Sequence, residues 1–297
     1  MDRLIGELKG VNEGPLLIFI GGLHGNEAQG LFALENIFSK FSIPLAQCAG
    51  KAIALRGNLK AIAANKRYIA KDLNRIWKDA EILKTQGSTL EELEEYEAIK
   101  QYIESEIEKG YPAVYLIDLH TTSAPTIPFA VTRNSPKNKQ LIEDIDIPYI
   151  TGLDGFLDGT LLSWMCEKGH CGLAFEAGQH QSKTSMIKHE AFVQLSMFYT
   201  GFTPSISEKE IQAIHNKLDE EIRPKHNHFV LTDRYAIAEG ETFKMEEGFT
   251  NFQRIYAGEI LAKNQHGEIL AESDANIFMP LYQKQGNDGF FIIKPAK

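Results

Sequence analysis

The sequence lacks the features that mark membrane, secreted and nucleic-acid-binding proteins. No uncharged apolar run reaches the roughly 18 residues that span a bilayer, and the longest candidate, Pro15 to Leu23, is interrupted by two glycines. The N-terminus mixes both charge signs without the apolar stretch of a signal peptide, so we expect a cytoplasmic location. Three cysteines are too few for a disulfide framework. The net charge of -9 argues against nucleic acid or an anionic membrane as the main partner.

The negative charge is concentrated in one segment. Between Glu91 and Lys109 the chain has eight Glu and two Lys, a net charge of -6. Apolar residues recur there at three- and four-residue steps, which predicts one long helix over 89–109. We expect its acidic run to be a solvated outer face, and a surface for a partner is the alternative.

The 297 residues suffice for one large domain, or for one large and one small. Short apolar runs alternate with helical patterns from Leu16 to about Tyr199, which predicts an α/β domain whose sheet contains parallel strands and is covered by helices. The expected strands are Leu16–Ile20, Lys51–Leu55, Val114–Asp118, Ile127–Val131 and Gly172–Phe175, and the expected helices are Glu27–Phe38, Thr89–Lys109, Leu161–Lys168 and Ser182–Tyr199. Later short runs between turn residues predict a small all-β domain, so we divide the chain into 1–205 and 206–297.

Side chains that bind metals follow two of the expected strands, at the edge where open α/β sheets bind ligands. Leu16–Ile20 leads into a Gly-rich turn that ends in His24 and Glu27, and Val114–Asp118 is followed by His120. Zinc commonly takes imidazole nitrogen and carboxylate oxygen, with one position left to water. The glycines lack the G-x-G-x-x-G spacing of a dinucleotide loop, and Glu27 would face a pyrophosphate with the wrong sign.

Further polar groups are expected at the same edge. Glu176 follows the apolar run Gly172–Phe175, and a carboxylate beside a zinc-bound water can take its proton and pass it to a leaving amine. The segment from Asn65 to Arg75 is a polar loop with little periodicity, and such loops carry function more often than packing. Its arginines suit a substrate carboxylate or a developing oxyanion, with ordinary surface charge as the alternative.

Four motifs occur in a fixed order between residues 16 and 180: Gly-Gly-x-His-Gly-Asn-Glu, Arg-Tyr-Ile-x-x-Asp-Leu-Asn-Arg, Asp-Leu-His-x-Thr and Phe-Glu-x-Gly. In this order they resemble the succinylglutamate desuccinylase and aspartoacylase family, which is related to zinc carboxypeptidases. The resemblance implies a mixed sheet with helices on both faces, as in zinc carboxypeptidases, followed by a β-rich tail. It also implies a zinc-dependent amide hydrolase that removes an N-acyl group, succinyl or acetyl, from a small-molecule amino acid.

The resemblance further implies which residues hold the metal and move the proton. One zinc ion per chain would be bound by His24, Glu27 and His120. Asp72 would not bind the metal itself but would contact one of the metal-bound histidines. Glu176 would be the base and proton shuttle. This residue set agrees with the implied hydrolase activity, because a bound zinc ion lowers the pKa of its water toward ~7 and makes hydroxide available at neutral pH.

Three residues of the polar loop would bind the substrate. By the same resemblance, Arg67 would polarise the scissile carbonyl and steady its oxyanion, and Asn74 and Arg75 would hold the α-carboxylate of the amino-acid half. The sequence departs from the family pattern shortly before the base glutamate. Acid-specific members carry an arginine there that reads a second carboxylate, whereas this chain offers only Lys168 and His170.

Two other functions fit the same residues. A zinc carboxypeptidase acting on small peptides would use the same metal and the same carboxylate-binding groups, and a β-rich tail that covers the cleft would argue against it. A non-catalytic ligand-binding relative is the second alternative, and the presence of Glu176 argues against it. The sequence leaves a homo-oligomer open.

Overall fold

The computed structural model describes residues 1–204, 206–219 and 223–296. One large sheet contains strands β1 (Leu4–Lys9), β2 (Asn12–Gly21), β3 (Ala49–Arg56), β4 (Val114–Thr122), β5 (Phe129–Thr132), β6 (Tyr149–Thr151), β7 (Cys171–Gln179), β8 (His228–Ala236), β10 (Arg254–Ile255), β13 (Ala275–Phe278) and β14 (Asp288–Pro295). Their order in the sheet is β1-β3-β2-β4-β7-β5-β6-β8-β14-β13-β10. Strands β3, β2, β4 and β7 run parallel, and β1 and β5 are antiparallel to their neighbours β3 and β7. The expected mixed sheet is therefore confirmed.

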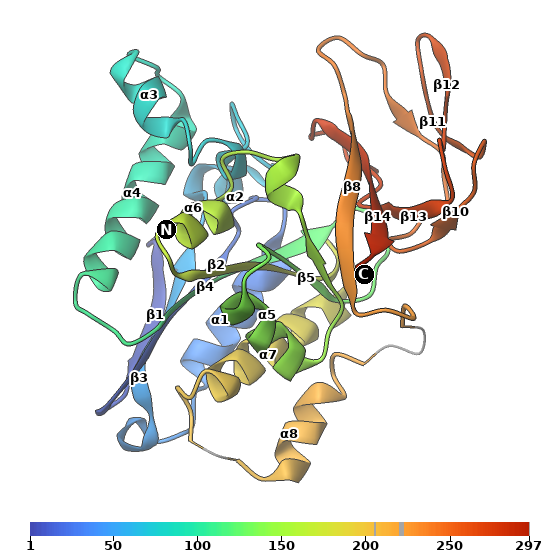
Figure 1. The fold of residues 1–297 in the computed structure, drawn as a ribbon. Coiled ribbons are helices and arrows are strands. Elements are labelled where there is room, and N and C mark those ends of the chain that lie inside the picture. The colour runs from blue at the N-terminus through green and yellow to red at the C-terminus, as the bar shows by residue number, and fades with distance from the viewer. Residues whose placement is uncertain (205, 220–222, 297) are drawn as a thin grey trace.

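Helices cover both faces of this sheet (Figure 1). The helices are α1 (Ala28–Ser39), α2 (Leu59–Ala64), α3 (Ala80–Thr85), α4 (Glu91–Ile107), α5 (Pro136–Ile145), α6 (Leu161–Glu167), α7 (Lys183–Tyr199) and α8 (Glu208–His215), with single 3-10 turns at Leu45–Gln47, Leu73–Arg75 and Leu153–Gly155. Helices α1, α5 and α7 pack on one face, and α4 and α6 pack on the other. None of the described helices combines the length and the apolar composition that crossing a bilayer requires.

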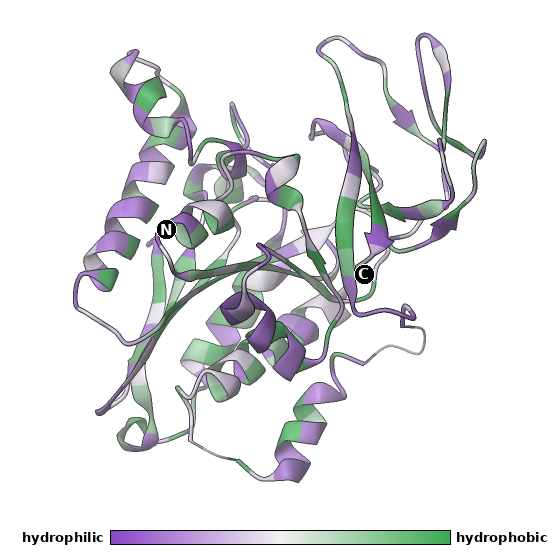
Figure 2. Cartoon of the chain, viewed as in Figure 1, coloured by the Kyte–Doolittle hydropathy of each residue, from purple (hydrophilic) through white to green (hydrophobic). Residues whose placement is uncertain are grey.

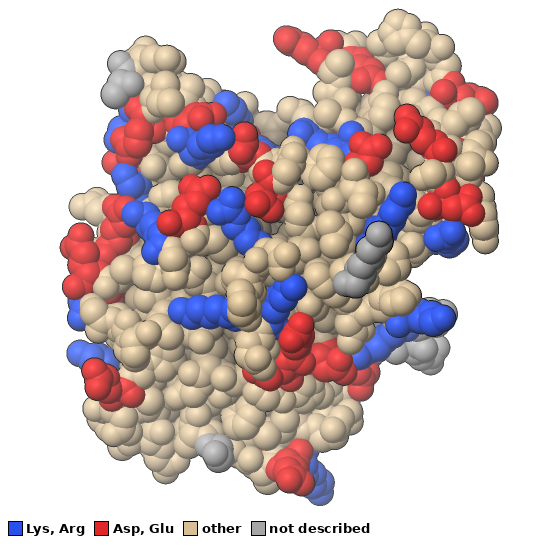
Figure 3. Space-filling model, viewed as in Figure 1, with Lys and Arg blue, Asp and Glu red and all other residues tan. Residues whose placement is uncertain are grey.

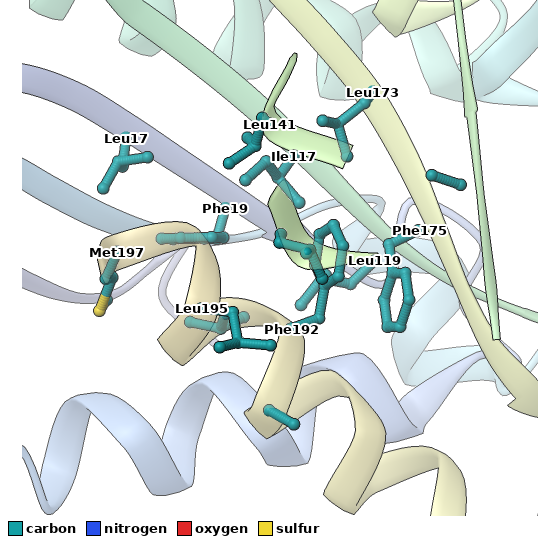
Figure 4. Close-up of a cluster of buried hydrophobic side chains, with 14 of the residues drawn as sticks. Leu17, Phe19, Ile117, Leu119, Leu141, Leu173, Phe175, Phe192, Leu195 and Met197 are labelled. Atoms are coloured by element: carbon teal, nitrogen blue, oxygen red, sulfur yellow. The ribbon is translucent and has the colours of Figure 1, made fainter. Parts of the chain in front are cut away.

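The core lies on both sides of the parallel strands. In the run Leu16–Ile20 the odd-numbered side chains join the cluster beneath α1 and α7, and the even-numbered ones join the cluster beneath α4. Successive strand residues point to opposite faces, so a continuous apolar run is what a strand covered on both faces needs. Figure 4 shows the α7 side of this core, where the rings of Phe175 and Phe192 stack with their centroids 3.9 Å apart.

The C-terminal strands continue the same sheet. Strand β8 pairs in parallel with β6, with Tyr149 opposite His228, and β14 and β13 follow as antiparallel neighbours. A separate small antiparallel sheet is formed by β9 (Lys244–Met245), β11 (Ile260–Asn264) and β12 (Gly267–Leu270). The β-rich C-terminal region is thus confirmed, with most of its strands joined to the α/β sheet. The boundary at 205 stays a prediction, and residue 205 lies outside the described residues.

The acidic helix α4 is only partly a solvated face. Figure 2 shows hydrophilic residues along much of this helix, and Figure 3 shows Lys and Arg side chains interleaved with acidic side chains on the same side of the molecule. Three of its glutamates are nevertheless buried, namely Glu92, Glu95 and Glu106. Arg3 pairs with Glu95, and Lys51 Nζ lies 3.1 Å from Glu106 Oε1. The expectation of a solvated face is wrong for these three residues, because their partners come from distant parts of the chain.

Candidate active site

Two histidines and a glutamate meet at the carboxyl ends of β2 and β4. His24 and Glu27 lie in the turn between β2 and α1, and His120 lies near the end of β4. One ligand atom from each residue lies within 4.8 Å of the others, and all three side chains are buried. Nδ1 of His24 is 2.9 Å from Glu27 Oε1, and Nδ1 of His120 is 2.9 Å from Glu27 Oε2. The structure therefore brings the three predicted metal ligands into one group that could hold an ion.

Close packing explains the glycines of the first turn. A Cβ added to Gly25 would lie 2.1 Å from the backbone carbonyl carbon of Ala61 in α2, so only glycine fits there. Gly22 has a φ of +72°, in the left-handed region that glycine adopts without strain. The turn is thus pressed against α2, and the backbone N–H of Gly25 donates to the carbonyl of Arg67. This packing places His24 and Glu27 next to the polar loop.

A carboxylate holds each histidine from its outer nitrogen. His24 Nε2 lies 3.1 Å from Asp72 Oδ1, and His120 Nε2 lies 2.6 Å from Asp118 Oδ2. Such contacts fix the orientation of the ring and leave Nδ1 facing the cluster, which is how metal-binding histidines are supported. Asp72 was expected in this position. Asp118 was not among the predicted site residues, although its place two residues before His120 on a strand puts both side chains on one face.

Burial and opposite charges shift the pKa values of this group. Burial by itself would raise the pKa of the Glu27 carboxyl, but His24 and His120 hold it well below its usual range. Burial would likewise lower the pKa of His120, but Asp118 and Glu27 raise it well above its usual value. The group is therefore a charge-compensated set in which a divalent cation can replace a proton.

Glu176 lies beside this group on β7. It is the register partner of His120 across the parallel strands β4 and β7, so the two side chains are neighbours on one face of the sheet. The residue is 6% exposed, and its Oε2 has no hydrogen-bond partner among the described residues. Burial raises the pKa of its carboxyl to about 8, against the opposing charge of His120. A buried carboxyl with a free oxygen and a pKa near neutrality is suited to exchange a proton with a bound molecule.

The polar loop between α2 and α3 brings Arg67, Asn74 and Arg75 to the same place. Arg67 Nη2 lies 2.9 Å from Asp72 Oδ2, so the arginine shares its partner with a histidine of the metal group. Arg75 Nη2 lies 2.9 Å from Asp288 Oδ2 at the start of β14. The loop is therefore tied to the metal group at one end and to the C-terminal strands at the other.

A glutamate of α4 holds this loop from behind. Glu92 is 1% exposed, and its carboxylate accepts hydrogen bonds of 2.7–3.3 Å from three successive backbone N–H groups of residues 69–71. These bonds fix the turn between Arg67 and Asp72. Glu92 was not among the predicted site residues, although it stands four residues before Tyr96, on the apolar stripe of the helix.

All of the predicted site residues except Asp72 line one pocket of about 120 Å³. Its polar end is lined by His24, Glu27, Arg67, Asn74, Arg75, His120 and Glu176. Asp72 does not line the pocket and instead contacts His24 and Arg67. Residues within 279–288, from the end of β13 to the first residue of β14, form one wall, and Gln285 accepts the backbone N–H of Arg67 at 3.1 Å. The C-terminal region thus closes the pocket against the polar loop.

Comparison with known protein sequences identifies the family. The profile described as the succinylglutamate desuccinylase/aspartoacylase catalytic domain matches residues 13–194, which is more than half of the chain. A probable aspartoacylase of Nostoc sp. is 34% identical over 105 residues, covering 35% of this chain and 34% of that protein. A probable aspartoacylase of Prochlorococcus marinus is 27% identical over 165 residues, covering 54% of this chain and 52% of that protein. The chain thus matches about a third to a half of the length of these curated relatives.

Solved structures share the fold over nearly the whole chain. A protein of Rhodobacter sphaeroides described as succinylglutamate desuccinylase/aspartoacylase has a TM-score of 0.70 at 16% identity, over 98% of this chain and 88% of that one. A succinylglutamate desuccinylase of Vibrio parahaemolyticus has a TM-score of 0.70 at 16% identity, over 98% and 86% of the two chains. These likenesses extend the shared fold through the C-terminal strands. The profile match over residues 13–194 shows that the chain belongs to the succinylglutamate desuccinylase/aspartoacylase family.

Proposed function

We propose that this protein is a zinc-dependent deacylase that hydrolyses the amide bond of an N-acyl amino acid. The observation that carries the proposal is the buried Glu176 carboxyl, which lines the pocket beside His24, Glu27 and His120 and has one oxygen without a hydrogen-bond partner among the described residues. Membership of a family whose members are named aspartoacylase and desuccinylase supports the reaction class.

The donor set fits zinc. Two imidazole nitrogens and one carboxylate oxygen are ligands that zinc prefers, and three protein ligands leave a fourth position open. The carboxylates of Asp72 and Asp118 on the outer nitrogens add the support that such histidines usually have. When bound there, zinc supplies Lewis-acid chemistry that polarises oxygen groups and favours deprotonation of water.

The remaining residues divide the reaction among them. Glu176 takes a proton from the attacking water and passes it to the amide nitrogen, so that the C–N bond breaks to give an amine and a carboxylic acid. Arg67 donates from its guanidinium to the carbonyl oxygen, where negative charge develops. Asn74 and Arg75 hold the α-carboxylate of the amino-acid half, with the arginine providing charge-assisted hydrogen bonds.

A carboxypeptidase acting on small peptides is the second candidate, since it needs the same groups. The wall formed by residues 279–288 favours the deacylase, because a covered pocket accepts a short acyl group more readily than a peptide chain. Comparing turnover of N-acetyl amino acids with that of tri- and tetrapeptides separates the two. Faster cleavage of the peptides would favour the carboxypeptidase.

The decisive experiment combines metal removal with one substitution. We expect chelation to abolish hydrolysis of a panel of N-acyl amino acids and added zinc to restore it. Glu176→Gln should lower kcat by about 10²–10⁴-fold, because it removes the proton-transfer group. The zinc content of the variant, measured by atomic absorption, should equal that of the unaltered protein, because Glu176 is not one of the three proposed metal ligands. Activity that is indifferent to chelation, or near-normal in the variant, would refute the proposal.

A further inference from the structure

The pocket extends beyond the polar groups into an apolar compartment. Its walls come from β5, β7, β14, the segment that leads into α6 and the first turn of α6, namely Val131, Leu153, Leu157, Leu162, Ala174 and Phe291. We use the name apolar compartment for this set. All six side chains belong to, or pack against, one buried hydrophobic cluster of the core, so the walls are fixed by packing.

Strand register places the apolar compartment next to the reacting groups. Ala174 stands two residues before Glu176 on β7, so both side chains lie on the same face about 7 Å apart along the strand. Val131 of β5 is the register partner of Ala174, and it continues the apolar wall across the sheet. A molecule that reaches Glu176 therefore has apolar surface directly beside it.

The same compartment adjoins the groups proposed to hold the α-carboxylate. Asn74 Oδ1 accepts the backbone N–H of Leu161 at 2.9 Å, and the next residue, Leu162, lines the apolar compartment. Arg75 is paired with Asp288, on the strand that also carries Phe291. A carboxylate held at Asn74 and Arg75 thus places its Cα, and the side chain on that Cα, against these walls.

No Lys or Arg among the described residues lines the apolar compartment, and the neighbouring Arg234 is already held by Asp288 and by the carbonyl of Phe156. The Lys and Arg residues that line the pocket are Arg67 and Arg75, and both lie at its polar end with carboxylate partners. Lys168 lies 2.9 Å from Glu104 and over the ring of Trp164, and it does not line the pocket. An anionic side chain would lose its hydration here without gaining a partner.

We propose that the substrate's amino-acid half carries an aliphatic or aromatic side chain, which occupies the apolar compartment. This inference rests on the deacylase function proposed above. In this binding mode the α-carboxylate contacts Asn74 and Arg75, and the amino-acid side chain contacts the walls of the apolar compartment.

Two measurements on the zinc-loaded full chain test it. The first compares kcat/KM for N-acetyl-leucine and N-acetyl-phenylalanine with that for N-acetyl-aspartate and N-acetyl-glutamate. We expect the apolar pair to be preferred by at least about tenfold, the discrimination that apolar contacts typically supply. The second compares the rise in melting temperature produced by free leucine, phenylalanine, aspartate and glutamate.

The two readouts separate this inference from the deacylase function. If none of the four acetyl compounds is hydrolysed, the deacylase proposal fails for this panel, and the melting temperatures still decide which side chain the pocket binds. A larger shift with leucine and phenylalanine supports the inference. A larger shift with the acidic amino acids, or a higher kcat/KM for their acetyl derivatives, overturns it.

A substitution in the wall tests the location. Leu153→Arg adds a cation at a partly buried position in the wall, so we expect it to narrow the preference for apolar substrates at least tenfold. Leu45→Arg is the matched control, because Leu45 is 39% exposed and does not line the pocket, and the preference should not change. If the Leu153→Arg protein does not fold, Leu162→Ala is the alternative variant. It enlarges the apolar compartment and should shift the preference from N-acetyl-leucine toward N-acetyl-phenylalanine. A folded wall variant with an unchanged preference would place the side chain elsewhere.

Discussion

Replacing Glu92 by glutamine should impair catalysis without touching the pocket. The Glu92 carboxylate has two oxygens, and together they accept the backbone N–H groups of residues 69–71. Glutamine keeps one acceptor oxygen and puts an NH₂ group in place of the other. That NH₂ group cannot accept a hydrogen bond, so at least one buried N–H group loses its partner, and the charge on the remaining bonds disappears.

The size of the effect follows from these contacts. A stranded buried donor costs about 1–3 kcal/mol, and hydrogen bonds to a charged group are worth about 1.5–3 kcal/mol each, so we expect Glu92→Gln to lose about 2–4 kcal/mol of stability. The loop can recover part of this free energy if its N–H groups shift toward water. Such a shift would also move Arg67, which stands just before residues 69–71 in the chain. A misplacement of about 1 Å at a catalytic group costs roughly 10²-fold in rate.

The split between kcat and KM distinguishes positioning from simple destabilisation. Under zinc saturation we expect kcat to fall ten- to a hundredfold and KM to change little, because Asn74 and Arg75 are also held by Leu161 and Asp288, outside the affected turn. Glu94→Gln is the matched control on the same helix. The Glu94 side chain is 76% exposed and pairs with Lys60 at the surface, so this change should leave both stability and kcat near their original values.

Denaturant unfolding and steady-state kinetics on the two variants decide the matter. A Glu92→Gln protein with unaltered stability would contradict the hydrogen-bond argument itself. A protein that is less stable but has the original kcat would show that the geometry of Arg67 does not depend on this helix.

Three further changes test other parts of the site. Glu176→Gln should stabilise the metal-free protein by an amount that grows from pH 5 to pH 8, as measured by calorimetry. The pKa of Glu176 is raised to about 8 in the folded protein, against 4.5 in the unfolded chain, so the folded state holds a proton that the unfolded chain releases. The unaltered protein therefore loses stability as the pH rises through this range, and the variant does not. An equal gain at both pH values would contradict this. Asp118→Asn should weaken zinc binding about 10–100-fold in chelator competition, because the support on His120 Nε2 is lost, and unaltered affinity would assign that support to another group. Arg75→Ala should raise KM about 10–150-fold, the equivalent of one charge-assisted hydrogen bond, with a smaller change in kcat; an unchanged KM would mean that another group holds the carboxylate.

Local patterns were enough to predict the central strands and the main helices, because alternation and helical spacing are local properties. Strand β1 was missed since its sequence, LIGELK, mixes charges with apolar residues and stays largely exposed at the edge of the sheet. The union of the C-terminal strands with the main sheet could not be predicted either. It depends on Tyr149 pairing with His228, and nothing local in either strand specifies so distant a partner.

The same limit applies within the site. The spacing of residues placed His24, Glu27, His120 and Glu176 at strand ends, and the structure brings them together. Their neighbours from other elements were harder to foresee. Glu92 was grouped with the surface glutamates, although its inward direction follows from the stripe it shares with the apolar residues of α4. A polar residue on the apolar stripe of a helix therefore indicates that a buried hydrogen-bond or ion-pair partner exists. The helix sequence alone does not identify that partner.

The position of Asp72 explains why the polar loop is so compact. Asp72 Oδ1 lies 3.1 Å from His24 Nε2 and accepts the backbone N–H of Asn74, while Oδ2 accepts from Arg67. One carboxylate thus orients a proposed metal ligand, a proposed oxyanion donor and the backbone of a proposed substrate-binding residue. Burial would raise the pKa of Asp72, but His24, Arg67 and Arg75 hold it well below its usual range, so the carboxylate stays ionised in this role. Loss of any one of these contacts would leave part of the shared charge unpaired, so Asp72 links the proposed metal group to the polar loop.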